Sequence, residues 1–264
     1  MIDDMATMSK ALQIFESNIR GMKQHLQLMD ASLVNAAKIC HNVAKNNSVK
    51  TIADALKSKE DYPQLNTPCK PIDIGRTFKT ARTKIHEQAI VELYRCYMSY
   101  LLNLIKEFLT IAPTRLLRGA AANQDNKMSY EDILLHYDNN ELIEIMSKGI
   151  LRRLENARDT QGLLQKILKF SGINIDEQTQ KRALLYLNIR HLIIHNNSKA
   201  DEKFIKMNEG FIKINSRNKL VINYELSSNA IQTISTLCSE IDNKLLEKKL
   251  LNPVANPNKQ EKTK

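Results

Sequence analysis

The chain contains no tryptophan, only seven glycines and few aromatic residues, whereas lysine, leucine, isoleucine and asparagine are abundant. This balance disfavours sheets and favours helices. With 264 residues the chain is long enough to bury a substantial core. We therefore expect an all-α fold in a single domain over residues 1–250.

Cysteines are also few and are widely spaced, at Cys40, Cys69, Cys96 and Cys238. No CxxC pair and no local set of Cys and His ligands surrounds them, so disulfides and a structural zinc site are both disfavoured. We expect four reduced thiols.

The sequence likewise lacks several motifs and segments that define large protein classes. It has no Gly-rich phosphate loop and no GxSxG motif, which argues against an NTPase and a serine hydrolase. No apolar run approaches the roughly 20 residues that a bilayer requires, and the first residues are acidic where a secretory signal is basic. We expect a cytoplasmic protein.

Charge is the most pronounced bulk property, with a formal net charge of +10. Its simplest functional interpretation is attraction to phosphate backbones or anionic surfaces. A coding bias toward Lys and Asn would give the same excess, so charge alone leaves both alternatives open.

Apolar spacing predicts long helices over residues 5–45 and 76–109, with an irregular, proline-containing connection over 46–78 between them. Helices are also predicted over 129–146, from 150 to Gly172, over 176–196 and over 229–250. Alternating residues predict a small β-hairpin at 211–224, and residues 251–264 resemble a disordered tail.

The helix predicted over 176–196 carries the most informative pattern. Its apolar residues surround nearly the whole circumference, so we expect a central helix. On a helical wheel with Arg190 at zero, the polar residues Asn188, His191 and His195 fall together between about 100° and 160°. Such a polar stripe on a buried helix needs partners.

Arg190 is followed by His191, three apolar residues and then His195, and Asn196 comes directly after. This Arg-x4-His pattern, with its extension over residues 198–204, resembles the HEPN superfamily and its RiboL-PSP-type branch. The resemblance implies a HEPN-like helical bundle with long N-terminal helices. It also implies a homodimer, an RNA-cleaving role in anti-phage defence or as a toxin, and an antitoxin or defence-system partner.

RNA cleavage without a metal or cofactor requires proton transfer and stabilisation of charge on the phosphate. Imidazole suits the proton steps and a guanidinium suits phosphate oxygens. We therefore assign His195 to acid–base chemistry and Arg190 to phosphate, with His191 as a further catalytic residue. Asn196 and Asn188 would position the substrate.

Other interpretations of these residues stay open. Arg190 and His195 could form a structural network, or an inactive HEPN protein could use them to bind RNA, nucleotide or a partner. His191 and His195 have metal-ligand spacing, although no third ligand is evident. The angle between Arg190 and His195 is about 140° on a regular helix, so the length of Arg190 or fraying after His195 must bring them together.

Additional RNA contacts are conceivable at the basic start of the second long helix, at Arg76, Lys79, Arg82 and Lys84, although a solvated helix face would look the same. The remaining histidines fall on exposed or mixed faces and are expected to be solvated or structural: His25, His41, His86 and His136. Three tyrosines of the same helix are expected in the core: Tyr94, Tyr97 and Tyr100.

Overall fold

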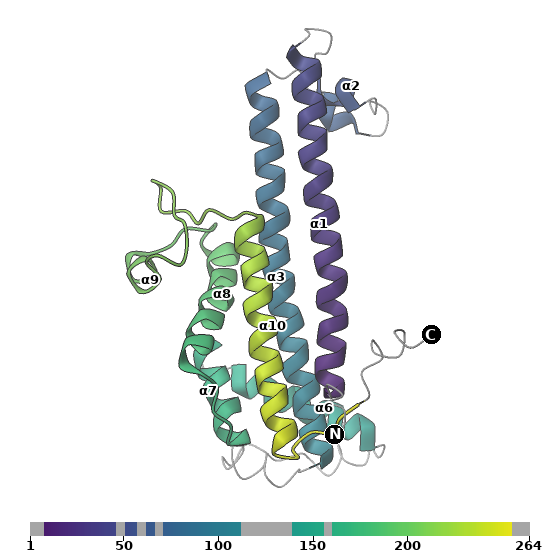
Figure 1. Ribbon diagram of the computed structural model, residues 1–264, viewed down its shortest axis with the longest axis vertical. Coiled ribbons are helices and arrows are strands. Elements are labelled where there is room, and N and C mark those ends of the chain that lie inside the picture. Colours follow the sequence, from purple (N-terminus) through teal and green to yellow (C-terminus); the bar gives the residue numbers. More distant parts are fainter. Residues whose placement is uncertain are drawn as a thin grey trace, which may run out of the picture. The chain divides into compact units, whose positions relative to one another are not determined.

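The structure is a computed structural model that describes residues 8–45, 51–56, 62–66, 71–111, 139–155 and 160–254. About 80% of these residues are helical and none belongs to a sheet, which confirms the all-α class. The longest helices are α1 (Lys10–Lys45) and α3 (Pro71–Ile111) (Figure 1). The shorter elements are α2 (Ile52–Leu56), the 3-10 helix η1 (Pro63–Asn66), α6 (Asn139–Glu155), α7 (Thr160–Ser171), α8 (Glu177–His195), α9 (Glu202–Met207) and α10 (Tyr224–Glu247).

Two compact units divide the chain, where the sequence predicted one domain. Unit 1 comprises Met1–Ile19, Leu93–Asn197 and Ala230–Lys264, and unit 2 comprises Arg20–Glu92 and Ser198–Asn229. The helices α1, α3 and α10 each contribute residues to both units. No helix in the described part of the chain has the length and apolar character needed to cross a bilayer.

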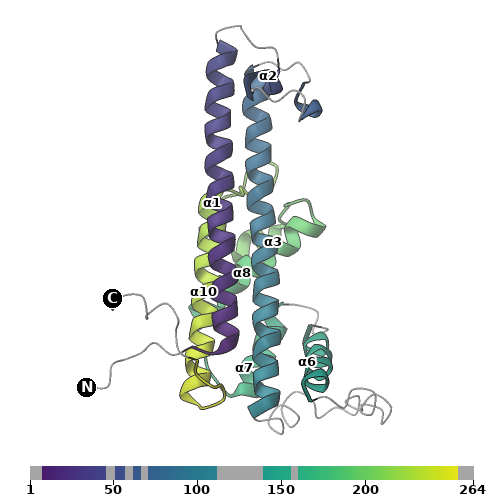
Figure 2. The same ribbon diagram turned by 90° about the vertical axis from the view of Figure 1, so that its right-hand side faces the viewer.

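In unit 1 the first turns of α1 pack against α3 and α10 (Figure 2). The rings of Phe15 and Tyr100 lie 5.7 Å apart, and the Tyr100 hydroxyl donates a hydrogen bond to the Cys238 carbonyl at 3.1 Å. The Ser9 amide donates to the Asp242 carboxylate at 2.9 Å. Burial of these apolar faces provides the main stabilisation of unit 1.

In unit 2 the rest of α1 packs against the first half of α3. Where these segments meet α2, a buried cluster forms from Cys40 of α1, Ile52 of α2 and Ile74 and Phe78 of α3. The short helix α2 therefore covers an apolar end of the helix pair.

Two helix boundaries differ from the sequence prediction. α3 begins at Pro71, before the predicted start at Arg76. Proline is well tolerated in the first turn of a helix, where its missing N–H would have no partner, so Pro71 starts α3 rather than preventing it. α6 continues through Gly149 to Glu155, where the sequence predicted a break, because one glycine lowers helix stability by only about 1 kcal/mol.

The predicted hairpin over residues 211–224 is wrong as a strand pair. The segment holds one isolated antiparallel bridge, between Ile214 and Leu220, and no strand was found there. The Asn215 side chain accepts hydrogen bonds from two backbone amides of the turn, at Arg217 and Lys219. The Leu220 amide donates to the Ser198 carbonyl at 2.9 Å. Across the turn, the Asn215 amide donates to the Lys219 carbonyl and the Val221 amide to the Lys213 carbonyl, each at 2.9 Å, so the pairing is confined to the residues beside the bridge.

Some sequence predictions fall outside the described residues. These are the first part of the helix predicted over 129–146, much of the connection over 46–78, and residues 255–264 of the predicted tail, together with Cys69 and His136. The described chain continues into the predicted tail, where Leu251 is buried and the Val254 amide donates to the Met8 carbonyl at 2.8 Å.

Candidate functional site

The Arg-x4-His motif lies at the C-terminal end of α8, in unit 1. Asp176 caps the start of this helix by accepting a hydrogen bond from the Thr179 amide at 2.8 Å, and Asn196 is the C-cap. One face of α8 is buried through Ala183, Leu184, Leu185, Leu187, Ile189 and Leu192. This face anchors the helix and fixes the direction in which the motif residues project.

The opposite face of α8 is polar and solvent-exposed. It carries Asn188, His191 and His195, with Asn196 exposed just beyond them. The expectation of a helix buried all round is therefore wrong, since Ile194 on the same side is 44% exposed. The wheel grouped the three polar residues correctly, but in the described part of the chain their side chains are exposed rather than buried against another helix.

Arg190 borders this exposed face and is half-buried. Its guanidinium carbon lies 4.8 Å from the centre of the Tyr94 ring on α3, a cation–π arrangement. Its Nε is buried and has no hydrogen-bond partner among the residues that the structure describes. A buried guanidinium nitrogen without a partner is costly, so Arg190 is a strong candidate for an anionic ligand.

The two histidines of the motif form a close pair. The ring centres of His191 and His195 are 4.7 Å apart, with an angle of 43° between the ring planes. Both rings are exposed. Across the described ranges, no third His, Cys, Asp or Glu joins them in a cluster of metal-ligand type. Two adjacent, exposed imidazoles are groups of the kind that exchange protons with a bound substrate.

Arg190 and His195 are not brought together by the folding of α8. The helix is regular through His195, so their side chains remain about 140° apart around its axis. The chain turns sharply only afterwards, with left-handed backbone at Asn197 (φ 51°) and Ser198 (φ 62°). In the described residues His195 instead meets His191, and Arg190 meets Tyr94.

The four predicted backbone-contact residues lie along α3 in unit 2, and three of them have acidic partners. Arg82 donates two hydrogen bonds to Asp30, at 2.8 and 3.0 Å. Lys84 pairs with Glu87 at 2.6 Å, and Arg76 lies 3.7 Å from Asp73. Lys79 is exposed and has no hydrogen bond or ion pair within the described part of the chain. Of these four residues, Lys79 alone carries a positive charge that no acidic partner compensates within the described part of the chain.

Sequence reasoning missed a buried polar cluster in unit 2. His86, expected on an exposed or mixed face, is 1% exposed. Its Nε2 lies 3.0 Å from Oδ1 of Asp30, and its Nδ1 lies 3.0 Å from the hydroxyl of Ser227. One signal was available, since His86 precedes the buried Ile90 and Leu93 by four and seven residues, the spacing of one helix face.

The charge state of this cluster follows from its surroundings. Hydrogen bonding to Arg82 lowers the pKa of Asp30, so the carboxylate is held in its charged form. Burial lowers the pKa of His86, although the hydrogen bond to Asp30 opposes that effect. A neutral His86 therefore lies beside an Asp30–Arg82 ion pair.

The whole chain, including the exposed polar face of α8, was compared with known proteins. Comparisons with family models, curated proteins and solved structures gave no match. The functional argument therefore depends on the motif residues and their geometry.

Proposed function

We propose that the chain is a metal-independent endoribonuclease of the HEPN type, acting as an anti-phage defence or toxin effector. The observation that carries the proposal is made at the end of α8, where an exposed histidine pair is bordered by a half-buried Arg190 whose Nε has no hydrogen-bond partner in the described residues. These are the groups that cleavage of an RNA phosphodiester requires, namely a guanidinium for the phosphate and imidazoles for the protons.

In the proposed reaction the 2′-oxygen of RNA forms a bond to phosphorus while the bond from phosphorus to the 5′-oxygen breaks. His195 takes the proton of the 2′-hydroxyl, and a protonated imidazole returns one to the leaving 5′-oxygen. The 4.7 Å separation of the rings allows His191 to act as the second proton carrier on the same phosphodiester. The products are a 2′,3′-cyclic phosphate and a 5′-hydroxyl.

Arg190 would bind the scissile phosphate and stabilise the charge that develops on it. The Tyr94 ring contacts the face of the guanidinium and restrains it. A contact of this kind does not use the N–H donors of the guanidinium, which can then bond to the phosphate. Asn188 and Asn196 are exposed on either side of the histidines and would position the ribose or base by hydrogen bonds.

A homodimer would complete the site. Because Arg190 and His195 diverge around α8, one copy cannot direct both at one phosphate through the helix alone. A second α8 related by a two-fold axis would place the Arg190 of one copy near the histidines of the other. The exposed Ile194 on this side of α8 would then be buried between the copies.

The decisive test is cleavage of total RNA and of tRNA in EDTA by purified wild type, Arg190→Ala and His195→Ala. We expect cleavage by the wild type alone, with 2′,3′-cyclic phosphate ends. His25→Ala is the matched control, because His25 is an exposed histidine in unit 2. Cleavage that persists in both motif variants contradicts the proposal. So does a wild-type protein that is dimeric and still does not cleave RNA.

A second candidate is an inactive HEPN protein that binds RNA or nucleotide. The separation of Arg190 from His195 within one chain favours it, since binding needs only the arginine and its neighbours. In this case Arg190→Ala would weaken RNA binding in a mobility-shift assay, His195→Ala would not, and no cleavage would accompany either result.

A further inference from the structure

A cavity of about 510 Å³ lies within unit 2. Its wall on α3 is one helix face, formed by Gly75, Lys79, Arg82, Thr83 and His86, which recur three or four residues apart. The volume falls within the usual range of small-molecule sites, about 300 to 1,000 Å³.

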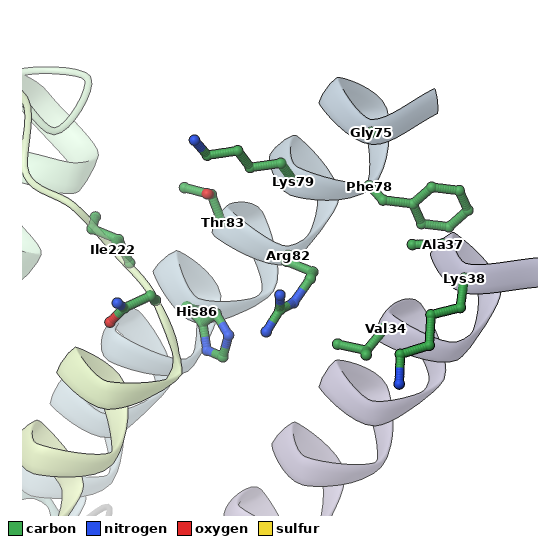
Figure 3. Close-up of a pocket in the computed structure, with 11 residues that line it drawn as sticks. Val34, Ala37, Lys38, Gly75, Phe78, Lys79, Arg82, Thr83, His86 and Ile222 are labelled. Carbon is green, nitrogen blue, oxygen red and sulfur yellow. The ribbon is translucent and has the colours of Figure 1, made fainter. Parts of the chain in front are cut away.

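The rest of the wall is largely apolar. Val34, Ala37 and Lys38 of α1 line it, together with Phe78 of α3 and Ile222 and Asn223, which precede α10. Figure 3 shows the Phe78 ring near Ala37, whereas Lys79 and Thr83 project toward the other side of the same stretch of α3. The cavity thus offers both an aromatic surface and polar donors.

The charges at the cavity are unbalanced. Lys38, Lys79 and Arg82 line it, and no carboxylate does. Asp30 binds Arg82 and His86, so one of the three cations is compensated. Lys38 and Lys79 are exposed and have no ion pair in the portion of the chain that the structure describes. The remaining positive charge favours an anionic ligand.

Arg82 and His86 are fixed in position at the cavity wall. Figure 3 shows the guanidinium and the imidazole side by side on α3, facing α1. Both bond to the same oxygen of Asp30, at 2.8 and 3.0 Å, and His86 also bonds to Ser227. Because these side chains are already held in place, they lose little conformational entropy when a ligand binds, and this favours affinity.

We propose that this cavity binds a small phosphate monoester that carries an aromatic group. The phosphate lies against Lys79, Arg82 and Thr83, which are neighbours on α3, and the aromatic group packs on the apolar wall formed by Val34, Ala37 and the accessible edge of Phe78. The inference does not depend on the proposed ribonuclease, because none of these residues belongs to the α8 motif.

The test is calorimetric titration of the full chain with 1-naphthyl phosphate. We expect one binding event, with inorganic phosphate and 1-naphthol each bound at least about tenfold more weakly, since each lacks one half of the recognition. Lys79→Gln removes a charged donor and should weaken binding by about tenfold or more. Lys206→Gln, which removes an exposed lysine outside the cavity, should leave it within about twofold.

Gly75 offers a second variant that keeps the fold intact. A side chain added at Gly75 meets no atom within 4 Å, so Gly75→Leu projects into open space at the cavity wall. Leucine is also the better helix former, so the melting temperature should hold or rise. We expect this variant to lose naphthyl phosphate binding while it remains folded.

Three results would overturn the proposal. One is a wild type that does not bind naphthyl phosphate, and another is binding that neither Lys79→Gln nor Gly75→Leu changes. The third is a 5′-phosphorylated RNA oligonucleotide that binds more tightly than naphthyl phosphate and, when added first, prevents naphthyl phosphate from binding. This last result would assign the cavity to RNA.

Discussion

The guanidinium carbon of Arg190 lies 4.8 Å from the centre of the Tyr94 ring, so a residue of α3 orients the arginine of the α8 motif. Both residues belong to unit 1. The contact restrains the long arginine side chain before any ligand arrives, which reduces the entropy lost when a phosphate binds.

The first prediction concerns this contact. Tyr94→Leu removes the aromatic face, and a cation–π contact contributes about 0.5 to 2 kcal/mol, so we expect a loss of about two- to thirtyfold in RNA cleavage or binding. Tyr94→Phe keeps the ring and should stay close to wild type. Equal losses in both variants would show that the ring does not act through Arg190.

A second prediction concerns the carboxylate shared by Arg82 and His86. Asp30→Asn removes the countercharge of the partly exposed Arg82 and the charged acceptor of the buried His86, so we expect a loss of about 1 to 3 kcal/mol in the free energy of unfolding. Asp73→Asn is the control, because its pair with Arg76 is exposed and should contribute less than about 1 kcal/mol. Urea denaturation at pH 7 measures both.

The pH dependence of the Asp30 effect has a defined sign. The pKa of Asp30 is lowered in the folded state, chiefly by Arg82. Its contribution to stability is therefore present above the unfolded pKa and is lost as the pH falls through the folded pKa. The difference between wild type and Asp30→Asn should shrink below about pH 4. A difference that grows in acid would contradict this assignment.

A third prediction concerns His86 and mild acid. Burial lowers the pKa of His86 in the folded state below the ordinary value of a histidine, so the unfolded chain takes up the proton first. The stability that the neutral ring contributes is complete above about pH 6.5 and is lost as the pH falls through the lower folded pKa. The melting temperature of His86→Gln should therefore depend less on pH between 7 and 5 than that of wild type. His25→Gln should retain the wild-type slope.

A fourth prediction concerns the start of α1. The Ser9 hydroxyl accepts a hydrogen bond from the Leu12 amide at 3.1 Å and donates one to the buried Asp242. Ser9→Ala loses a helix cap and one bond to a buried carboxylate, so we expect about 2 to 3 kcal/mol of destabilisation. Ser17→Ala, an exposed site on the same helix, should be close to neutral. A similar loss in both variants would refute the role of Ser9.

The sequence predicted the elements whose apolar period is long and clear. The long helices α1 and α3 and the last helix α10 follow such a period, whereas the apolar residues of the motif helix α8 surround nearly its whole circumference. The hairpin was wrong because alternation over a few residues does not show which backbone groups pair. In the structure Leu220 bonds to Ser198, a residue outside the predicted hairpin.

The candidate site was predictable in its composition but not in its surroundings. The wheel grouped Asn188, His191 and His195 on one face, yet it could not show that this face is exposed or that Tyr94 meets Arg190. The Asp30–His86 contact joins residues 56 positions apart on different helices. Periodicity along one helix carries no information on such a pair.

The bond between Ser9 and Asp242 joins positions 233 apart in the chain, so it also sets an order of events during synthesis. The ribosome releases Ser9 well before Asp242, so the Ser9 hydroxyl and amide wait for α10 before they meet their carboxylate partner. Closing so long a loop is entropically costly and slow compared with forming local helical turns. Unit 1 therefore completes this contact only after α10 has been synthesised, and a product truncated before Asp242 would lack the partner of Ser9.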